Sequence, residues 1–261
     1  LINKKYDYSI IELFGSIKFK KNIYEKSKGL AYSGLFTMIA WVLFYELDQL
    51  FISKYLGVKS VAIYAIALTF PVLLRQILGI IFSPFIERSN HFIGVNDKKG
   101  FNELIYNMVI LSAPFVLVST ISLSLISEQL ILSWVGNDYS KSITLATVLA
   151  LSFLFSFITY PTDILLLAKV EIKKLYAIAI IPIIIFWLGV VTTFSSFGVL
   201  SLAMFKFISI IIIQIIYLPL LLKNLNITFK KFSREVIIPI TIPILILVLA
   251  ILLLKSFMPI E

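Results

Sequence analysis

SVAIYAIALTFPVLLRQILGIIFSPFI, residues 60–86, is a 27-residue stretch with a single charged side chain, Arg75. About 20 predominantly apolar residues are enough for a helix to cross the hydrocarbon core of a bilayer. The stretch is longer than the apolar part of an ordinary soluble helix, and one charge is too few to give it a solvated face. It therefore predicts a transmembrane helix.

Six further apolar runs of similar length accompany this one along the 261 residues. They cover residues 30–52, 104–126, 143–168, 175–195, 199–222 and 236–254. The bulk composition agrees, with 60% hydrophobic residues and a mean hydropathy of +1.02. The sequence thus predicts an all-α, polytopic transmembrane helix bundle of about seven spans.

Lysine and arginine are concentrated in every second connection between these runs. Of the 23 basic residues, 17 fall on one side of the predicted bundle, four on the other, and Arg75 and Lys206 inside spans. Short cytoplasmic loops carry such an excess, so the first residues are predicted to be cytoplasmic and the last ones external. The basic residues are scattered over four segments, so the net charge of +9 does not indicate a nucleic-acid partner.

The residues of several common catalytic and metal sites are missing from the sequence. It has no cysteine, one histidine (His91), no phosphate-binding glycine loop and no HExxH motif. The external connections are short, so the sequence predicts no extramembrane domain. We therefore expect no enzyme activity, no metal and no cofactor, and expect function to reside between the helices.

Three segments make up the predicted organisation. Residues 1–29 form a basic juxtamembrane arm, residues 30–222 a six-helix lobe, and residues 223–261 a cytoplasmic loop followed by one additional helix. The sequence does not begin with methionine and opens in a basic, polar stretch, so we interpret it as part of a longer protein.

Ionisable side chains inside the spans are the candidate functional residues: Glu46, Asp48, Arg75, Asp163 and Lys206. A charge at the bilayer centre costs roughly 2.5–3.5 kcal/mol, so these groups are expected to face a bundle interior or a water-filled cleft. Pro161 is expected to bend its helix and to direct Asp163 toward such a cleft. Lys206 lies near enough to a span end to extend toward the surface. A purely structural role in ion pairs between helices is the alternative for all five.

One segment resembles a known family. FYELDQLFISKYLGVKSVAIYAIALTFPVLL, residues 44–74, contains Asp48 near a helix end, the turn Lys54-Tyr55-Leu56-Gly57, and then Val61, Tyr64 and Ala67. Pro84 before a basic loop and Leu132-Ser133-Trp134-Val135-Gly136 follow. These features resemble the Wzx-type flippases for O-antigen and capsule, members of the multidrug/oligosaccharidyl-lipid/polysaccharide exporter superfamily. The resemblance covers residues 30–222.

The resemblance implies that these helices are the C-terminal lobe of a two-lobed, MATE-like transporter whose N-terminal lobe lies outside this sequence. Such proteins move a polyprenyl-pyrophosphate-linked oligosaccharide across the bacterial cytoplasmic membrane by alternating access. Arg75, and with less support Lys206, would then offset the anionic head group. Asp48 or Asp163 would bind a proton or Na⁺ whose gradient drives transport.

Two other functions remain open. A drug or cation antiporter of the same superfamily would have another cargo and would favour acidic groups, which Arg75 argues against. A polytopic glycan polymerase or glycosyltransferase would need a sizeable external loop or an acidic catalytic pair. Glu128 and Asp138 are ten residues apart in a short connection and do not form such a pair.

Overall fold

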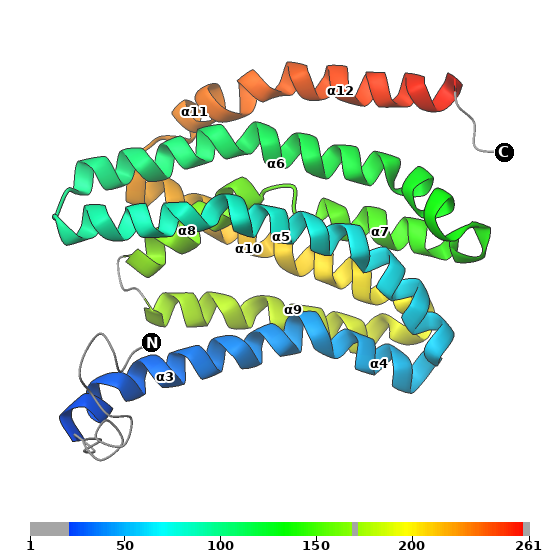
Figure 1. Ribbon diagram of the computed structural model, residues 1–261, viewed down its shortest axis with the longest axis horizontal. Coiled ribbons are helices and arrows are strands. Elements are labelled where there is room, and N and C mark those ends of the chain that lie inside the picture. Colours follow the sequence, from blue (N-terminus) through cyan, green and yellow to red (C-terminus); the bar gives the residue numbers. More distant parts are fainter. Residues whose placement is uncertain (1–20, 169–171, 258–261) are drawn as a thin grey trace, which may run out of the picture. The chain divides into compact units, whose positions relative to one another are not determined.

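The computed structural model describes residues 21–168 and 172–257, and within these residues every regular element is helical (Figure 1). The chain divides into two compact units, Leu1–Val42 and Leu43–Glu261. The described part of the first unit consists mainly of helix α3, Lys21–Trp41. Residues 1–20 of the predicted juxtamembrane arm lie outside the described residues.

The second unit contains the remaining helices. A π-helical turn, η1 (Val42–Glu46), leads into it, and its elements are α4 (Leu47–Leu56), α5 (Val58–Gly94), α6 (Lys98–Val135), the 3₁₀ turn η2 (Asn137–Tyr139), α7 (Lys141–Leu151), α8 (Ser156–Ala168), α9 (Ile172–Phe197), α10 (Val199–Leu225), α11 (Phe229–Phe232), the π-helical turn η3 (Ser233–Ile237) and α12 (Ile238–Phe257).

The helices coincide with the predicted apolar runs. Among the described residues, six helices are long and apolar enough to cross a membrane, and the bent pair α7–α8 is a seventh candidate. The prediction of an all-α polytopic bundle is therefore confirmed. In a bilayer only internal hydrogen bonds can satisfy the backbone, which is why such apolar runs adopt helices.

The fourth run differs from its prediction. The sequence placed a bend at Pro161, but Pro161 lies inside α8, and the chain bends by 47° at the turn formed by residues 152–155. This break was not predicted from the sequence. Helix kinks often occur at proline. The break at residues 152–155 contains no proline and is stabilised by a side chain of another helix, as described below.

The junctions between helices follow from local residue chemistry. Gly57 is alone between α4 and α5 and adopts φ = +77°, a conformation that side chains rarely allow. The Asp97 carboxylate begins α6 by accepting a hydrogen bond from the Gly100 N–H at 2.9 Å. Asn226 ends α10 in the left-handed conformation, and Thr228 then caps α11. These short junctions keep consecutive helices antiparallel.

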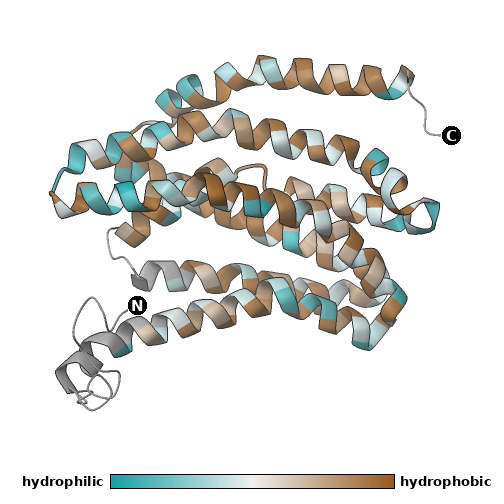
Figure 2. Ribbon diagram, viewed as in Figure 1, coloured by the Kyte–Doolittle hydropathy of each residue, from teal (hydrophilic) through white to brown (hydrophobic). Residues whose placement is uncertain are grey.

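Polar connections alternate between the two ends of the second unit. The α5–α6 and α10–α11 connections lie at one end, where α8 also ends, whereas the α4–α5, α6–α7 and α9–α10 connections lie at the other (Figure 1). Figure 2 shows hydrophilic residues at the first of these ends and a nearly uniform hydrophobic α12. The lysine-rich connections described by the structure thus share one end, as the charge pattern predicts.

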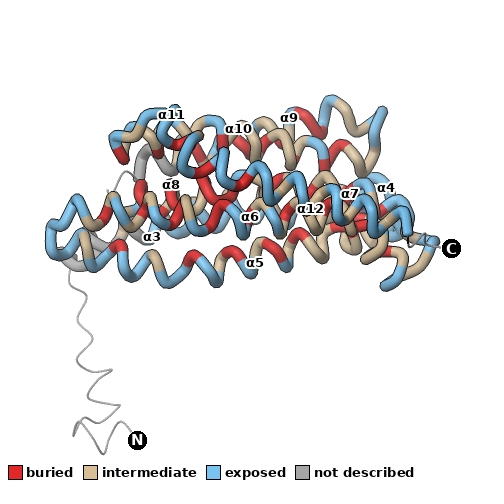
Figure 3. Tube along the Cα trace, turned by 90° about the horizontal axis from the view of Figure 1, so that it is seen from above, coloured by how far each residue is buried: buried red, intermediate tan, exposed pale blue. Residues whose placement is uncertain are grey.

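Two apolar clusters form the core of the second unit. One joins α5, α6, α8, α10 and α12, and includes Leu78, Ile105 and Leu165. The other joins α4, α5, α7, α9 and α10, and includes Ile52, Leu149 and Phe186. In Figure 3 the buried positions recur along the inner helices, whereas α12 is exposed or half-buried along most of its length.

The Phe205 ring of α10 packs directly against Gly189 of α9. A Cβ atom at Gly189 would lie 1.9 Å from Cδ1 of Phe205, so only glycine fits here without movement of the ring. Small residues at helix contacts are a common means of close packing in membranes, where burial of apolar groups supplies little driving force.

Candidate functional site

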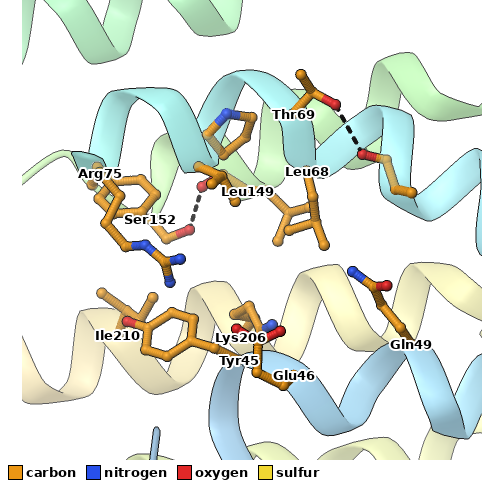
Figure 4. Close-up of a pocket in the computed structure, with 14 residues that line it drawn as sticks. Tyr45, Glu46, Gln49, Leu68, Thr69, Arg75, Leu149, Ser152, Lys206 and Ile210 are labelled. Carbon is orange, nitrogen blue, oxygen red and sulfur yellow. Dashed lines mark hydrogen bonds between the residues drawn. The ribbon is translucent and has the colours of Figure 1, made fainter. Parts of the chain in front are cut away.

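A pocket of about 290 Å³ lies within the second unit (Figure 4). Its walls come from η1 and α4 on one side, α5 and α10 on others, and the break between α7 and α8. The polar lining side chains are Tyr45, Glu46, Gln49, Thr69, Arg75, Ser152 and Lys206. A pocket with this many polar groups inside an apolar bundle is where a polar ligand fits.

Arg75 extends from α5 across this pocket toward η1 (Figure 4). Its guanidinium carbon lies 4.3 Å from the centre of the Tyr45 ring, which is cation–π contact distance. The Tyr160 hydroxyl donates to the Arg75 carbonyl oxygen at 3.5 Å. The Tyr45 ring therefore supports the guanidinium from one side at the pocket wall.

Lys206 makes a buried ion pair with Asp48. The two side chains are 4% and 0% exposed, and the Tyr64 hydroxyl donates to the same carboxylate oxygen at 2.7 Å. The ammonium also lies 5.4–5.9 Å from the centres of four aromatic rings, those of Phe44, Tyr45, Tyr64 and Phe186. Lys206 does not extend toward the surface, and that expectation was wrong. A buried ammonium group without a counter-charge would lower the stability of the folded protein, and the Asp48 carboxylate supplies that counter-charge.

Glu46 is the exposed carboxylate of the pocket. It is the last residue of η1, a π-helical turn, and such turns are frequent at functional sites. The Trp187 indole N–H donates to the Leu43 carbonyl oxygen of the same turn at 2.8 Å, which anchors η1 to α9. Gln49, one turn further along, contributes an amide to the same wall.

Asp163 lies on α8 and does not line the pocket. Its carboxylate accepts a hydrogen bond from the Tyr217 hydroxyl of α10 at 2.6 Å, and the side chain is half-buried. The structure therefore brings Glu46, Arg75 and Lys206 to one pocket, places Asp48 directly behind Lys206, and holds Asp163 on a separate contact.

The break at residues 152–155 contributes both a wall and a polar contact. The Ser156 N–H bonds to the Phe153 carbonyl, so the Ser152 carbonyl loses its usual helical partner. The buried Gln214 amide of α10 donates to that carbonyl at 3.1 Å. Irregular backbone at membrane depth requires such a partner, and Gln214 supplies it.

Sequence reasoning missed Gln49, Thr69 and Ser152, the neutral polar residues that line the pocket. It also missed Gln214 and Tyr217, which bond Ser152 and Asp163 from α10. Gln214 carried a signal, because it interrupts the apolar run IIIIQII. Thr69 bonds the carbonyl of Ala65 and gave no sign of facing a pocket. In the described part of the chain, no three histidine, aspartate or glutamate side chains group as a metal site would require.

The sequence matches no protein-family model and no curated protein.

Proposed function

We propose that this chain is one lobe of a multi-pass membrane transporter that moves a lipid-linked oligosaccharide by alternating access. The chain would lie in the bacterial cytoplasmic membrane with its first residues in the cytoplasm. A second, N-terminal lobe would complete the transport path. The observation that supports this proposal most is the polar pocket within an apolar helical bundle, with Arg75 in its wall.

Arg75 suits the anionic part of such a cargo. A planar guanidinium presents paired donors that match phosphate oxygens, and it remains charged in a low-dielectric site. Its contact with the Tyr45 ring holds it at the pocket wall, so less side-chain freedom is lost when a ligand binds. Glu46, Gln49 and Thr69 add acceptors and donors suited to sugar hydroxyls.

The size of the pocket fits part of the cargo. About 290 Å³ is near the lower end of the roughly 300–1,000 Å³ typical of ligand pockets. This space takes a pyrophosphate or a single sugar ring. The remaining sugars would occupy space between this lobe and the second lobe.

The ion pair changes the assignment of roles made from the sequence. Lys206 is bound by Asp48, so we assign the positive charge that meets the cargo to Arg75. Asp48 is likewise engaged by Lys206 and Tyr64. Any proton or Na⁺ coupling is therefore proposed for Glu46 or Asp163.

The experiment uses the full-length protein in a flippase-null strain, with surface polysaccharide as the readout. Arg75→Ala is expected to abolish export while the amount of protein in the membrane stays near normal. Arg75→Lys should retain part of the export, because lysine keeps the positive charge but lacks the paired N–H donors of the guanidinium. Arg88→Ala, at an exposed position of the same helix, is the matched control and should export normally. Normal export by Arg75→Ala would refute the proposal for this residue.

A cation or drug antiporter is the second candidate, favoured by the exposed Glu46 carboxylate beside the Tyr45 ring. A carboxylate with an aromatic ring is a recognised way to bind an organic cation. Resistance to cationic drugs that depends on Glu46 and is lost in Glu46→Gln would favour the antiporter over the flippase.

A further inference from the structure

A second, apolar groove lies beside α12 at the surface of the second unit and shares no residue with the polar pocket. It has a volume of about 380 Å³ and runs between α10 and α12, with the α7–α8 break at its base. Of its 16 lining residues only Gln214 and Thr241 are polar, and Thr241 bonds the Ile237 carbonyl of its own helix. The groove therefore fits a hydrocarbon chain.

Apolar walls alone do not select an occupant in a membrane. Lipid tails are as apolar as the groove, so inserting a chain has no hydrophobic driving force. Exposed lining residues such as Ile215 and Leu245 leave the groove open to surrounding lipid. Selection of one lipid must therefore come from its head group.

Basic side chains lie next to the start of the groove. Lys230 of α11 and Arg234 of η3 belong to the segment whose Phe229, Phe232, Val236 and Ile237 line the start of the groove. Both basic side chains are exposed, and neither forms an ion pair with an acidic side chain that the structure describes. They are available to an anionic head group.

The neighbouring charged residues are already engaged. The Tyr106 hydroxyl of α6 donates to Glu235 at 2.5 Å, and the Lys231 ammonium lies 5.7 Å from the centre of the Tyr106 ring. These contacts attach α11 and η3 to α6. Lys231 and Glu235 are thus engaged with Tyr106, and the exposed basic side chains of Lys230 and Arg234 remain beside the groove-lining residues of the same segment.

The length of the groove matches one leaflet. From Ile237 to Leu245 a helix rises about 12 Å, close to the roughly 15 Å of hydrocarbon in half a bilayer. We propose that this groove binds one anionic phospholipid, with its phosphate at Lys230 and Arg234 and one acyl chain between α10 and α12. The lipid fills the gap beside α12, whose own buried contacts are few.

The test measures lipid binding to the purified full-length protein by native mass spectrometry, with phosphatidylglycerol and phosphatidylcholine of identical chains. We expect one tightly bound phosphatidylglycerol and weaker phosphatidylcholine. A basic residue at a membrane surface contributes about fivefold in affinity, so Lys230→Ala with Arg234→Ala should weaken phosphatidylglycerol binding about 25-fold. Arg88→Ala with Lys98→Ala, two exposed basic positions at the same end of the bundle, is the matched control and should change little.

A second pair of variants tests whether an acyl chain occupies the groove. Leu245→Trp fills the groove at an exposed position and should weaken both phospholipids, whereas Leu249→Trp, one turn further on and outside the groove, should not. Equal binding of the two phospholipids, or no effect of the Lys230 and Arg234 changes, would overturn the proposal. So would a polyprenyl-pyrophosphate lipid that displaces phosphatidylglycerol and is itself weakened by Leu245→Trp, because the groove would then hold the transported lipid.

Discussion

The ammonium of Lys206 on α10 binds the carboxylate of Asp48 on α4, across 158 residues of sequence and with both side chains buried. This contact joins the helix that follows η1 to the centre of the second unit. It also leaves the pocket with an internally neutralised pair beside Arg75. The pair is thus a structural part of the site, which is why we propose Arg75 and not Lys206 as the charge that meets a ligand.

Replacing one partner of the Lys206–Asp48 ion pair should destabilise the protein more than replacing both partners with apolar residues. Lys206→Met leaves a buried carboxylate without its cation, which typically costs about 3–5 kcal/mol of unfolding free energy. Lys206→Met combined with Asp48→Leu should recover most of the loss, as measured by thermal unfolding in detergent. The exposed Lys255–Glu128 pair is the control, and Lys255→Ala should cost less than about 1 kcal/mol. An unfolding temperature of Lys206→Met equal to that of the unchanged protein would contradict the structural role.

The α9–α10 contact should depend on the absence of a side chain at Gly189. Gly189→Ala places a methyl group against the Phe205 ring and is expected to lower the unfolding free energy by about 1–3 kcal/mol. Gly79→Ala is the matched control, because it is also inside a helix and no atom lies within 4 Å of the added Cβ. Thermal unfolding of the two variants should differ in this order, and equal values would argue against the close contact.

The break in the fourth span should depend on Gln214. Gln214→Leu removes the donor to the Ser152 carbonyl, and a buried unsatisfied carbonyl costs about 1–3 kcal/mol. Hydrogen exchange of the backbone near residues 152–156 should accelerate, while exchange in α9 should be unchanged. Gln76→Leu, at an exposed position of α5, serves as the control. Unchanged exchange at the break in Gln214→Leu would show that another contact holds it.

The orientation of the bundle can be tested in this cysteine-free chain. Lys98 begins α6 and Asp138 follows its other end, so the two positions belong to opposite membrane faces. Single cysteines at Lys98 and Asp138 should react with an impermeant reagent from opposite sides, with Asp138 labelled in intact cells. Labelling of both positions from outside would contradict the predicted topology.

Local information in the sequence was sufficient for the helices. Six of the seven apolar runs recur as membrane-length helices and the fourth as the bent pair α7–α8, because a bilayer leaves the backbone no other partner. The depth of Arg75 predicted that its charge would face the bundle interior, and the structure has it at the pocket wall, whereas the expectation that Lys206 extends toward the surface was wrong. What the sequence could predict was therefore the presence of polar groups within the bundle.

Contacts between distant residues were beyond the sequence. Nothing local distinguishes Asp48 from Asp163 as the partner of Lys206, because the choice depends on how α4 and α10 meet. The break at residues 152–155 has the same origin, since its stabilising donor is Gln214, 62 residues from Ser152. Pro161 offered a local reason to bend the helix, and tertiary contacts determined the position instead.

Reconstitution into vesicles can show whether the pocket with Arg75 carries an anionic lipid-linked sugar across the membrane. The full-length protein is placed in vesicles that contain a fluorescent polyprenyl-pyrophosphate oligosaccharide, and the fraction of lipid accessible to an external quencher is followed over time. We expect protein-dependent exchange between leaflets that falls at least tenfold in Arg75→Ala and is unchanged in Arg88→Ala. Exchange that is absent with the unchanged protein, or equally fast with Arg75→Ala, would contradict this expectation.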